Sequence, residues 1–303
     1  MTDIFLQLLD EVVEQGISHY QQGTHGAVLD LRELPPDQEI ILIGDLHTKL
    51  KHLQLILEDR QEDESGAEPR EPDDSVLQKL EDGRAMLVIL GDAVHFESFR
   101  SEISDRRELQ ERLREMQSSL TIMAHIFDLK LRFPDRVHYV LGNHDYLSGR
   151  CVKDGVRQGL ELKQCIEDRF GKEAMVQYWR FLRNCPVLLV GDGIVAAHAG
   201  PAHGLRSLDE VLAVNPAMEE DPVVQSLVWG RFGANFEPEQ IHSFLRAIGQ
   251  EGAYFVVGHS PHLIPKIDFK VEFAPRCFVI YAAGSFVGYA AFKDRQLRFY
   301  RVL

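Results

Sequence analysis

The sequence predicts an α/β fold in which several strands end in polar residues at one edge of a sheet. Short apolar runs have the length and composition of strands buried on both faces. Stretches with apolar residues at steps of three and four alternate with them and are typical of amphipathic helices. Asp, Asn or His follows within two positions of the end of each of five runs, at residues 40–43, 86–90, 137–141, 194–197 and 254–257.

The composition is typical of a globular protein, since 45% of the 303 residues are hydrophobic and 26% are charged. No apolar run approaches the roughly 20 residues of a membrane span, and the acidic first residues do not resemble a signal peptide. The cysteines form no Cys-x-x-Cys pair, which favours a reduced, cytoplasmic protein. The net charge of −14 argues against general nucleic-acid binding, although bound cations would still allow a phosphate-containing substrate.

The first third of the chain predicts a leading helix over residues 3–22 and then a strand–helix unit that starts at residue 40. Residues 59–83 are expected to form an acidic loop. Residues 59–74 of this loop hold eight acids and two arginines. Such a segment is typical of a solvated loop, and a regulatory or docking segment is the alternative.

The rest of the chain continues the same domain, which we expect to span residues 1–303. A helical insertion is predicted over residues 98–132, with an apolar stripe formed by Leu109, Leu113, Met116, Leu120, Met123 and Phe127. We expect this stripe to pack on the sheet, and a lid formed by residues 100–115 is the alternative. The Asp-Gly at residues 192–193 predicts a hairpin, and three short strands are expected after residue 276.

The five polar strand ends predict a site for two metal ions. Glycine precedes the polar residue at four of them, and it lets the backbone turn tightly and approach a ligand. Carboxylates and neutral imidazoles suit manganese, iron and zinc, and a shared carboxylate can bridge two metals. The candidate ligands are Asp45, His47, Asp92, Asn143, His198 and His259.

These motifs, in this order, resemble those of the calcineurin-like metallophosphoesterases, and in particular a divergent, bacterial-type member of the phosphoprotein phosphatase family. The resemblance covers residues 40 to about 290. It implies a four-layer α/β/β/α sandwich of two mixed sheets flanked by helices. It also implies two metal ions, for which manganese is expected and iron or zinc are alternatives.

The resemblance further implies a role for each site residue. Asp45 and His47 would hold one metal, Asp92 would bridge, and the other three ligands would hold the second. His144 would be the general acid, and a metal-bridging hydroxide would attack a phosphomonoester directly. A phosphoanhydride such as a dinucleoside polyphosphate is the alternative substrate, and a metal-binding module without catalysis is the alternative function.

One motif departs from the family pattern, because His95 and Phe96 replace an Asp-Arg pair. The aspartate of that pair would orient the general acid, and the arginine would bind phosphate. Asp145 or Glu97 could support His144 instead. The expected phosphate contacts are Asn143, Arg231 and His95, with Lys49 and Arg100 as second choices, and the alternative for Arg231 is a surface role beside Trp229.

Overall fold

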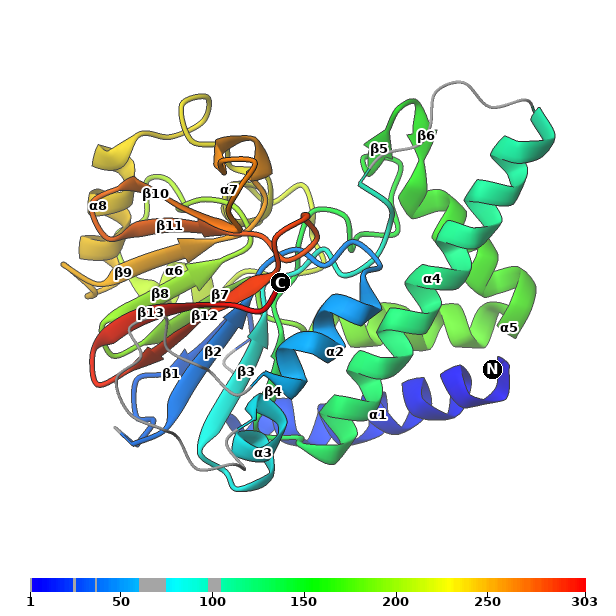
Figure 1. Cartoon of the computed structure of the whole chain (residues 1–303), viewed down its shortest axis with the longest axis horizontal. Helices are drawn as coiled ribbons and strands as arrows, with labels where there is room; N and C mark the ends of the chain where they lie inside the picture. Colours follow the sequence, from blue (N-terminus) through cyan, green and yellow to red (C-terminus); the bar gives the residue numbers. More distant parts are fainter. Residues whose placement is uncertain (1, 24–25, 36, 60–74, 98–104) are drawn as a thin grey trace.

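The computed structural model describes residues 2–23, 26–35, 37–59, 75–97 and 105–303. Two large β-sheets lie face to face, and helices cover their outer faces (Figure 1). The strands of the sheets are β1 (Val28–Leu31), β2 (Glu39–Ile43), β3 (Ala85–Ile89), β4 (Val137–Tyr139), β7 (Leu188–Gly191), β8 (Ile194–Ala197), β9 (Tyr254–Val257), β10 (Lys270–Ala274), β11 (Cys277–Ile280), β12 (Gly288–Lys293) and β13 (Gln296–Arg301). A separate hairpin consists of β5 (Val152–Lys153) and β6 (Val156–Arg157).

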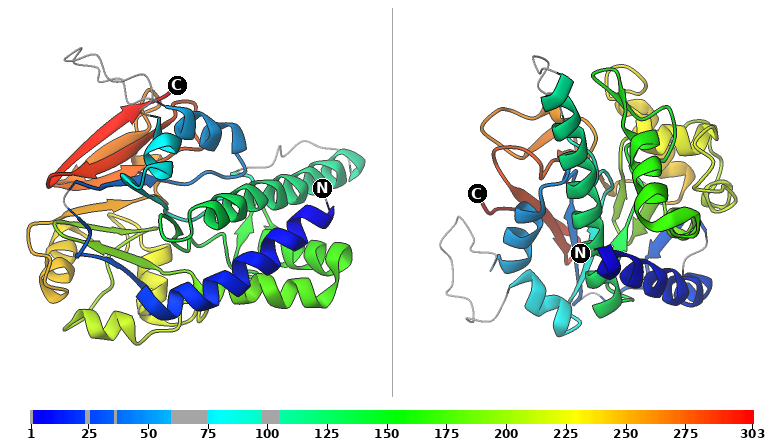
Figure 2. Two further views of the ribbon diagram at one scale, coloured as in Figure 1. Left: turned by 90° about the horizontal axis from the view of Figure 1, so that it is seen from below. Right: turned by 90° about the vertical axis from the view of Figure 1, so that its right-hand side faces the viewer.

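The helices are distributed over both sides of the two sheets and over one end of the molecule (Figures 1 and 2). None of the helices in the described ranges is both long enough and apolar enough to cross a lipid bilayer. They are α1 (Thr2–Gly23), α2 (Leu50–Glu58), α3 (Val76–Glu81), α4 (Asp105–Arg132), α5 (Gln158–Asn184), α6 (Leu208–Leu212), α7 (Pro222–Trp229), α8 (Pro238–Ala247) and the short 3-10 helix η1 (Pro261–Leu263).

The central strands are buried on both faces, as their continuous apolar runs predict. In β2, Ile40 and Leu42 belong to the core between the two sheets. Ile41 and Ile43 alternate with them and belong to the core under the helices. Each such side chain contributes about 1.5–3 kcal/mol when it is fully removed from water. Both faces of this strand are therefore needed to hold the layers together, which confirms the predicted sandwich.

The topology brings strand ends from both sheets to one place. Strands β2, β3 and β4 run parallel in the five-stranded sheet, whose order is β13-β12-β2-β3-β4. Strands β8, β9 and β11 run parallel in the six-stranded sheet, whose order is β1-β7-β8-β9-β11-β10. A β-bridge between Asp45 and Tyr281 links the end of β2 to the end of β11. The carboxyl ends of these strands consequently face a common edge.

Helix α4 differs from its prediction in one respect. The apolar side chains from Met116 onward are buried, but Leu113 is 52% exposed. The amino-terminal part of the helix extends beyond the sheets (Figure 1), so no sheet covers Leu113. Helix α1 instead packs against α4 and α5, where the ring centroids of Phe5 and Phe170 lie 5.0 Å apart. Residues 100–104 of the alternative lid lie outside the described residues.

The expected acidic loop at residues 59–83 is wrong in its last part, which forms the short helix α3. Ser75 caps this helix by accepting a hydrogen bond from the backbone N–H of Gln78 at 3.1 Å. Val76 and Leu80 are four residues apart and completely buried. A serine cap followed by this spacing was a readable helix signal, although the neighbouring acids obscured it. Residues 60–74 lie outside the described residues.

Candidate metal centre

The structure brings together all six predicted metal ligands at the carboxyl ends of five strands. We call Asp45, His47, Asp92, Asn143, His198 and His259 the metal-ligand cluster. Every member is buried, with at most 5% of its surface exposed. Three of the six have the left-handed backbone that non-glycine residues rarely adopt, with φ of 40° at His47, 50° at Asp92 and 47° at His259. Such strained conformations are concentrated at functional sites.

Two glycines of the motifs are required because a side chain at either position would collide with a ligand carboxylate. A Cβ atom at Gly142 would lie 2.2 Å from Oδ1 of Asp92, and one at Gly258 would lie 2.2 Å from Oδ1 of Asp45. A residue just after each of these two glycines donates its backbone N–H to the carboxylate that the glycine admits. His144 donates to Asp92 at 2.8 Å, and His259 donates to Asp45 at 3.1 Å.

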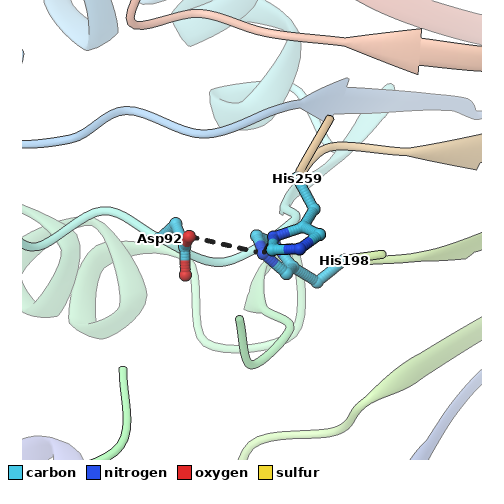
Figure 3. Close-up of side chains that lie close together, drawn as sticks. All are labelled: Asp92, His198 and His259. Carbon is cyan, nitrogen blue, oxygen red and sulfur yellow. Dashed lines mark hydrogen bonds and ion pairs between the residues drawn. The ribbon is translucent and has the colours of Figure 1, made fainter. Parts of the chain in front are cut away.

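Two groups of side chains within the cluster could each hold a cation, and they share one residue. Asp45, His47 and Asp92 form the first group, and Asp92, His198 and His259 form the second (Figure 3). Within each group the potential ligand atoms all lie within 4.8 Å of one another. Asp92 is therefore in the place that the sequence assigned to a bridging carboxylate.

The second group fits a metal ion closely. Nε2 of His198 lies 2.9 Å from Oδ1 of Asn143, 3.2 Å from Nδ1 of His259 and 3.3 Å from Oδ2 of Asp92. Neighbouring ligands in an octahedral shell with bonds of about 2.1 Å lie about 3 Å apart. Nδ1 of His198 lies 2.7 Å from the backbone oxygen of Leu90 and can donate its proton there. This leaves a lone pair on Nε2 among other electron-pair donors, an arrangement that a cation would stabilise.

In the first group, backbone oxygens again lie beside Nδ1 of the histidine, and an additional carboxylate, that of Glu97, lies beside its Nε2. Nδ1 of His47 lies 3.3 and 3.2 Å from the backbone oxygens of Val94 and His95, which assigns its proton to that nitrogen when the ring is neutral. Nε2 of His47 lies 2.9 Å from Glu97 and 3.8 Å from Asp45. The hydroxyl of Tyr281 donates to Glu97 at 2.8 Å. Glu97 thus contacts Nε2 of His47, the ring nitrogen that would bind a metal.

The charges of the cluster stabilise one another in the absence of a metal. Burial lowers the pKa of His47, but the hydrogen bond to Glu97 and the charge of Asp92 outweigh it and raise the pKa to about 9. Burial also lowers the pKa of His198, and Asp92 and Asp45 raise it to about 9. Metal ions would have to displace these protons, since only the deprotonated ring nitrogen can be a ligand.

Asp145 does not support His144, contrary to one of the sequence-based alternatives. Its Oδ1 accepts a hydrogen bond from the hydroxyl of Tyr139 at 2.7 Å. Its Oδ2 accepts from the backbone N–H groups of Gly142 at 2.7 Å and Asp92 at 3.1 Å. Asp145 therefore ties together the backbones of two ligand-bearing loops. Glu97, the other alternative, makes its own contacts with His47 and Tyr281 instead.

His95 is fully buried beside His144, and its contact with phosphate stays a prediction. Nδ1 of His95 lies 3.0 Å from Oε1 of Glu115 on α4. Gln158 donates to the same oxygen at 2.8 Å. We call these three residues the His95 cluster. Among the described residues, Nε2 of His95 has no hydrogen-bond partner, and the centroids of the His95 and His144 rings are 6.2 Å apart.

His144 itself lies against the metal-ligand cluster. Its ring is nearly perpendicular to that of His47, with the centroids 5.3 Å apart. Burial lowers its pKa to about 4, although the charge of Asp92 raises it in part. Nδ1 of His144 lies 3.3 Å from Sγ of Cys151, a residue that sequence reasoning did not connect with the site. No motif pointed to Cys151, since it lies in an irregular segment before β5.

The sandwich resembles known phosphatase structures. A protein serine/threonine phosphatase from Saccharomyces cerevisiae, with similarity to human phosphatase PP5, superposes with a TM-score of 0.65. The sequences are 12% identical, and the match covers 98% of this chain and 89% of that one. The chain therefore shares the fold of this phosphatase. This confirms the fold class predicted from the strand-end motifs.

Two further solved structures match with lower TM-scores. A cold-active protein tyrosine phosphatase has a TM-score of 0.50 and 14% identity over 94% of this chain and 85% of that one. A putative diadenosine tetraphosphatase has a TM-score of 0.44 and 14% identity over 91% and 98% of the two chains. The family described as bacterial capsule synthesis protein PGA_cap matches residues 194–290. No curated protein matches the sequence.

Of the predicted phosphate contacts outside the metal-ligand cluster, Arg231 and Lys49 are exposed at the surface. Arg231 is exposed and follows α7, and its charge lowers the pKa of the neighbouring His259, for which burial is the larger cause. The rings of Trp229 and His259 contact each other with centroids 6.3 Å apart. Lys49 is exposed, and Arg100 lies outside the described residues. Lys153 in β5, which the sequence did not single out, contacts Glu97 at 3.3 Å.

Proposed function

We propose that this protein is a metal-dependent phosphoesterase that hydrolyses a phosphomonoester, either a phosphoprotein or a small phosphate ester. The observation that carries the proposal is the pair of Asp/His groups that share Asp92. Two neighbouring cations with a common carboxylate are suited to the attacking and leaving oxygens of a phosphoryl transfer. The phosphatases that share the fold are consistent with this reaction class.

The side chains of the site would divide the work between holding cations and handling a proton. Asp45 and His47 would hold one cation and Asn143, His198 and His259 the other, with Asp92 between them. Bound cations would supply an activated water and positive charge for the phosphate oxygens. Manganese is our first choice, with iron and zinc as alternatives, because oxygen and imidazole ligands suit all three.

His144 would donate the proton that the leaving oxygen needs. Its backbone N–H donates to Asp92, so the position of the ring is coupled to that of the proposed bridge. Arg231 would attract the phosphate from the exposed side of the site, since its charge acts on His259. The substrate would be attacked directly by the activated water, without a phosphoenzyme.

Turnover of para-nitrophenyl phosphate by metal-stripped protein, before and after addition of manganese, tests the proposal. We expect no turnover without metal and turnover after two equivalents are bound. Binding of two manganese ions without turnover would instead indicate a metal-binding module. If turnover occurs, a panel of phosphopeptides, small phosphomonoesters and dinucleoside polyphosphates separates a phosphomonoesterase from the alternative phosphoanhydride hydrolase.

A further inference from the structure

The thiol of Cys151 occupies the place at which a proton-donating histidine needs a partner. A general acid that gives up the proton on one ring nitrogen is held by a hydrogen bond at the other nitrogen. In His144 that other nitrogen is Nδ1, which lies 3.3 Å from Sγ of Cys151. Cys151 has no exposed surface, so water does not compete for this contact.

The thiol of Cys151 has three polar contacts but only one hydrogen to donate. Sγ of Cys151 donates to the backbone oxygen of His144 at 3.8 Å. Sγ also accepts a hydrogen bond from the backbone N–H of Gly159 at the start of α5. When the thiol hydrogen is directed to this carbonyl, the sulfur is free to accept a hydrogen bond from Nδ1–H of His144. Nε2 is then the ring atom left for the leaving oxygen.

No other described polar side chain near His144 replaces this contact. Asp145 is engaged by Tyr139 and two backbone N–H groups, and Glu97 is engaged by His47 and Tyr281. His95 binds Glu115 through Nδ1. Within the described part of the chain, none of these side chains hydrogen-bonds to the His144 ring, whereas Cys151 contacts both its ring and its main chain.

Close packing around Gly159 holds the start of α5 next to the sulfur of Cys151. A Cβ atom at Gly159 would lie 2.4 Å from the backbone oxygen of Tyr146 and 2.6 Å from that of Ser148. Only glycine lets α5 begin this close to the loop that follows His144. The first residues of α5 thus support Cys151 through Gly159, and Gln158 joins the His95 cluster beside it.

We propose that Cys151 is the positioning residue of His144, and that its sulfur takes the place of the carboxylate partner that this chain lacks at His95. The sulfur accepts the Nδ1–H of His144 and orients Nε2 toward the leaving oxygen. The resting ring is the neutral Nδ1–H tautomer, which takes up a second proton at Nε2 from the solvent. During turnover this Nε2–H bond breaks and an O–H bond forms on the leaving group, while Nδ1 keeps its proton and the ring returns to the neutral tautomer. This inference rests on the proposed phosphoesterase function.

The kinetic test compares Cys151→Ala with Cys151→Ser and with a control, Cys277→Ala. Cys277 is also buried, but it lies at the amino-terminal end of β11, away from the site. We expect Cys151→Ala to lower kcat about 10- to 100-fold with KM and manganese stoichiometry unchanged. Cys151→Ser, which keeps a donor and an acceptor, should recover most of this loss. Cys277→Ala should leave kcat unchanged.

The choice of leaving group separates loss of proton donation from general damage. Phenyl phosphate releases a more basic oxygen than para-nitrophenyl phosphate and needs the proton more. Cys151→Ala should therefore slow phenyl phosphate hydrolysis several-fold more than para-nitrophenyl phosphate hydrolysis. Equal losses on both substrates, or loss of manganese from the variant, would overturn the positioning role.

A measurement without turnover keeps this inference separate from the proposed function. Nitrogen-15 NMR of the histidine side chains in zinc-loaded protein, assigned with His144→Asn, reports which ring nitrogen of His144 carries the proton. We expect a protonated Nδ1 in the wild type and in Cys151→Ser, and a mixture of tautomers in Cys151→Ala. An unprotonated Nδ1 in the wild type would overturn the inference, even if the protein is an active phosphoesterase. An inactive protein with a protonated Nδ1 would overturn only the function.

Discussion

The metal-ligand cluster and the surroundings of His144 lie side by side but are assembled differently. Every ligand in the cluster follows a strand end, within four residues of the last strand position. The side chains that surround His144 and the adjacent His95 come instead from α4, from an irregular loop and from the first residues of α5. Cys151 contacts His144, and Glu115 contacts His95 and Gln158. A sheet edge thus organises the cluster, whereas helix packing organises the surroundings of the proton donor.

This difference implies that the two regions can be altered independently. The cluster carries buried carboxylates and imidazoles, so changes there should act on metal binding. The side chains around His144 make neutral or paired contacts and have no direct place in the two ligand groups. Changes there should act on turnover while the metals stay bound. Substitutions and titrations in each region would test this separation.

Asp92→Asn should have the largest effect, because Asp92 belongs to both ligand groups. We expect it to weaken both metals by more than the roughly 10- to 100-fold typical for loss of an outer-shell partner, and to abolish turnover at micromolar metal. Equilibrium dialysis with manganese measures both affinities. Loss of one metal with the other retained would show that Asp92 does not bridge.

His144→Asn should keep both metals and lower kcat about 100- to 10,000-fold, the usual contribution of a general acid. The asparagine retains the backbone N–H that donates to Asp92, so the cluster should keep its geometry. Steady-state kinetics and metal analysis on the same sample check both parts. A variant that no longer binds two metals would place His144 in the cluster rather than beside it.

Metal affinity should fall as the pH is lowered, because His47 and His198 have pKa values raised to about 9 without metal. Protons compete with the metal below this pH, so each site should lose about tenfold in affinity per pH unit between pH 8 and 6. Titration calorimetry in buffers of different ionisation enthalpy would detect the released protons. Affinity that is independent of pH would mean that these rings are not ligands.

The same two histidines should make the free energy of unfolding of the metal-free protein fall as the pH rises, whereas metal affinity rises with pH. Their folded-state pKa values lie above the unfolded value of about 6.5, so they stabilise the fold fully below pH 6.5. This contribution is lost as the pH rises through about 9. Urea unfolding of metal-free protein at pH 6 and pH 9 should therefore show lower stability at pH 9, whereas the metal-loaded protein should not lose stability over this range. Equal metal-free stabilities would contradict the raised values.

Arg231→Ala should have the smallest effect, because Arg231 is exposed and its attraction to phosphate is screened. We expect KM to rise up to about fivefold, with kcat and metal binding unchanged. Arg246→Ala is a matched control, since Arg246 is also exposed but lies in α8 and pairs with Glu251. A fall in kcat with constant KM would show that Arg231 contacts the transition state instead of attracting the substrate.

Much of the fold was predictable because its signals are local. The buried strands and the Asp-Gly hairpin between β7 and β8 lie where periodicity and turn residues place them. Helix α7 was missed, although Asp221 caps it and Pro222 begins it, a recognised start signal. The hairpin β5–β6 and strand β10 were missed as well, because two-residue strands and an exposed edge strand carry almost no periodic pattern.

The ligand cluster could be predicted from the sequence, because each candidate ligand follows an apolar strand and parallel strands end at one edge. The sequence also shows that histidine, not aspartate, stands at position 95. What lies beside His144 instead became visible only once the helices were packed in three dimensions. Cys151 reaches Nδ1 because glycine lets the first turn of α5 pack against the loop after His144, and Glu115 reaches His95 because α4 packs along the same side. Such contacts depend on how helices pack, and no spacing along the chain encodes them.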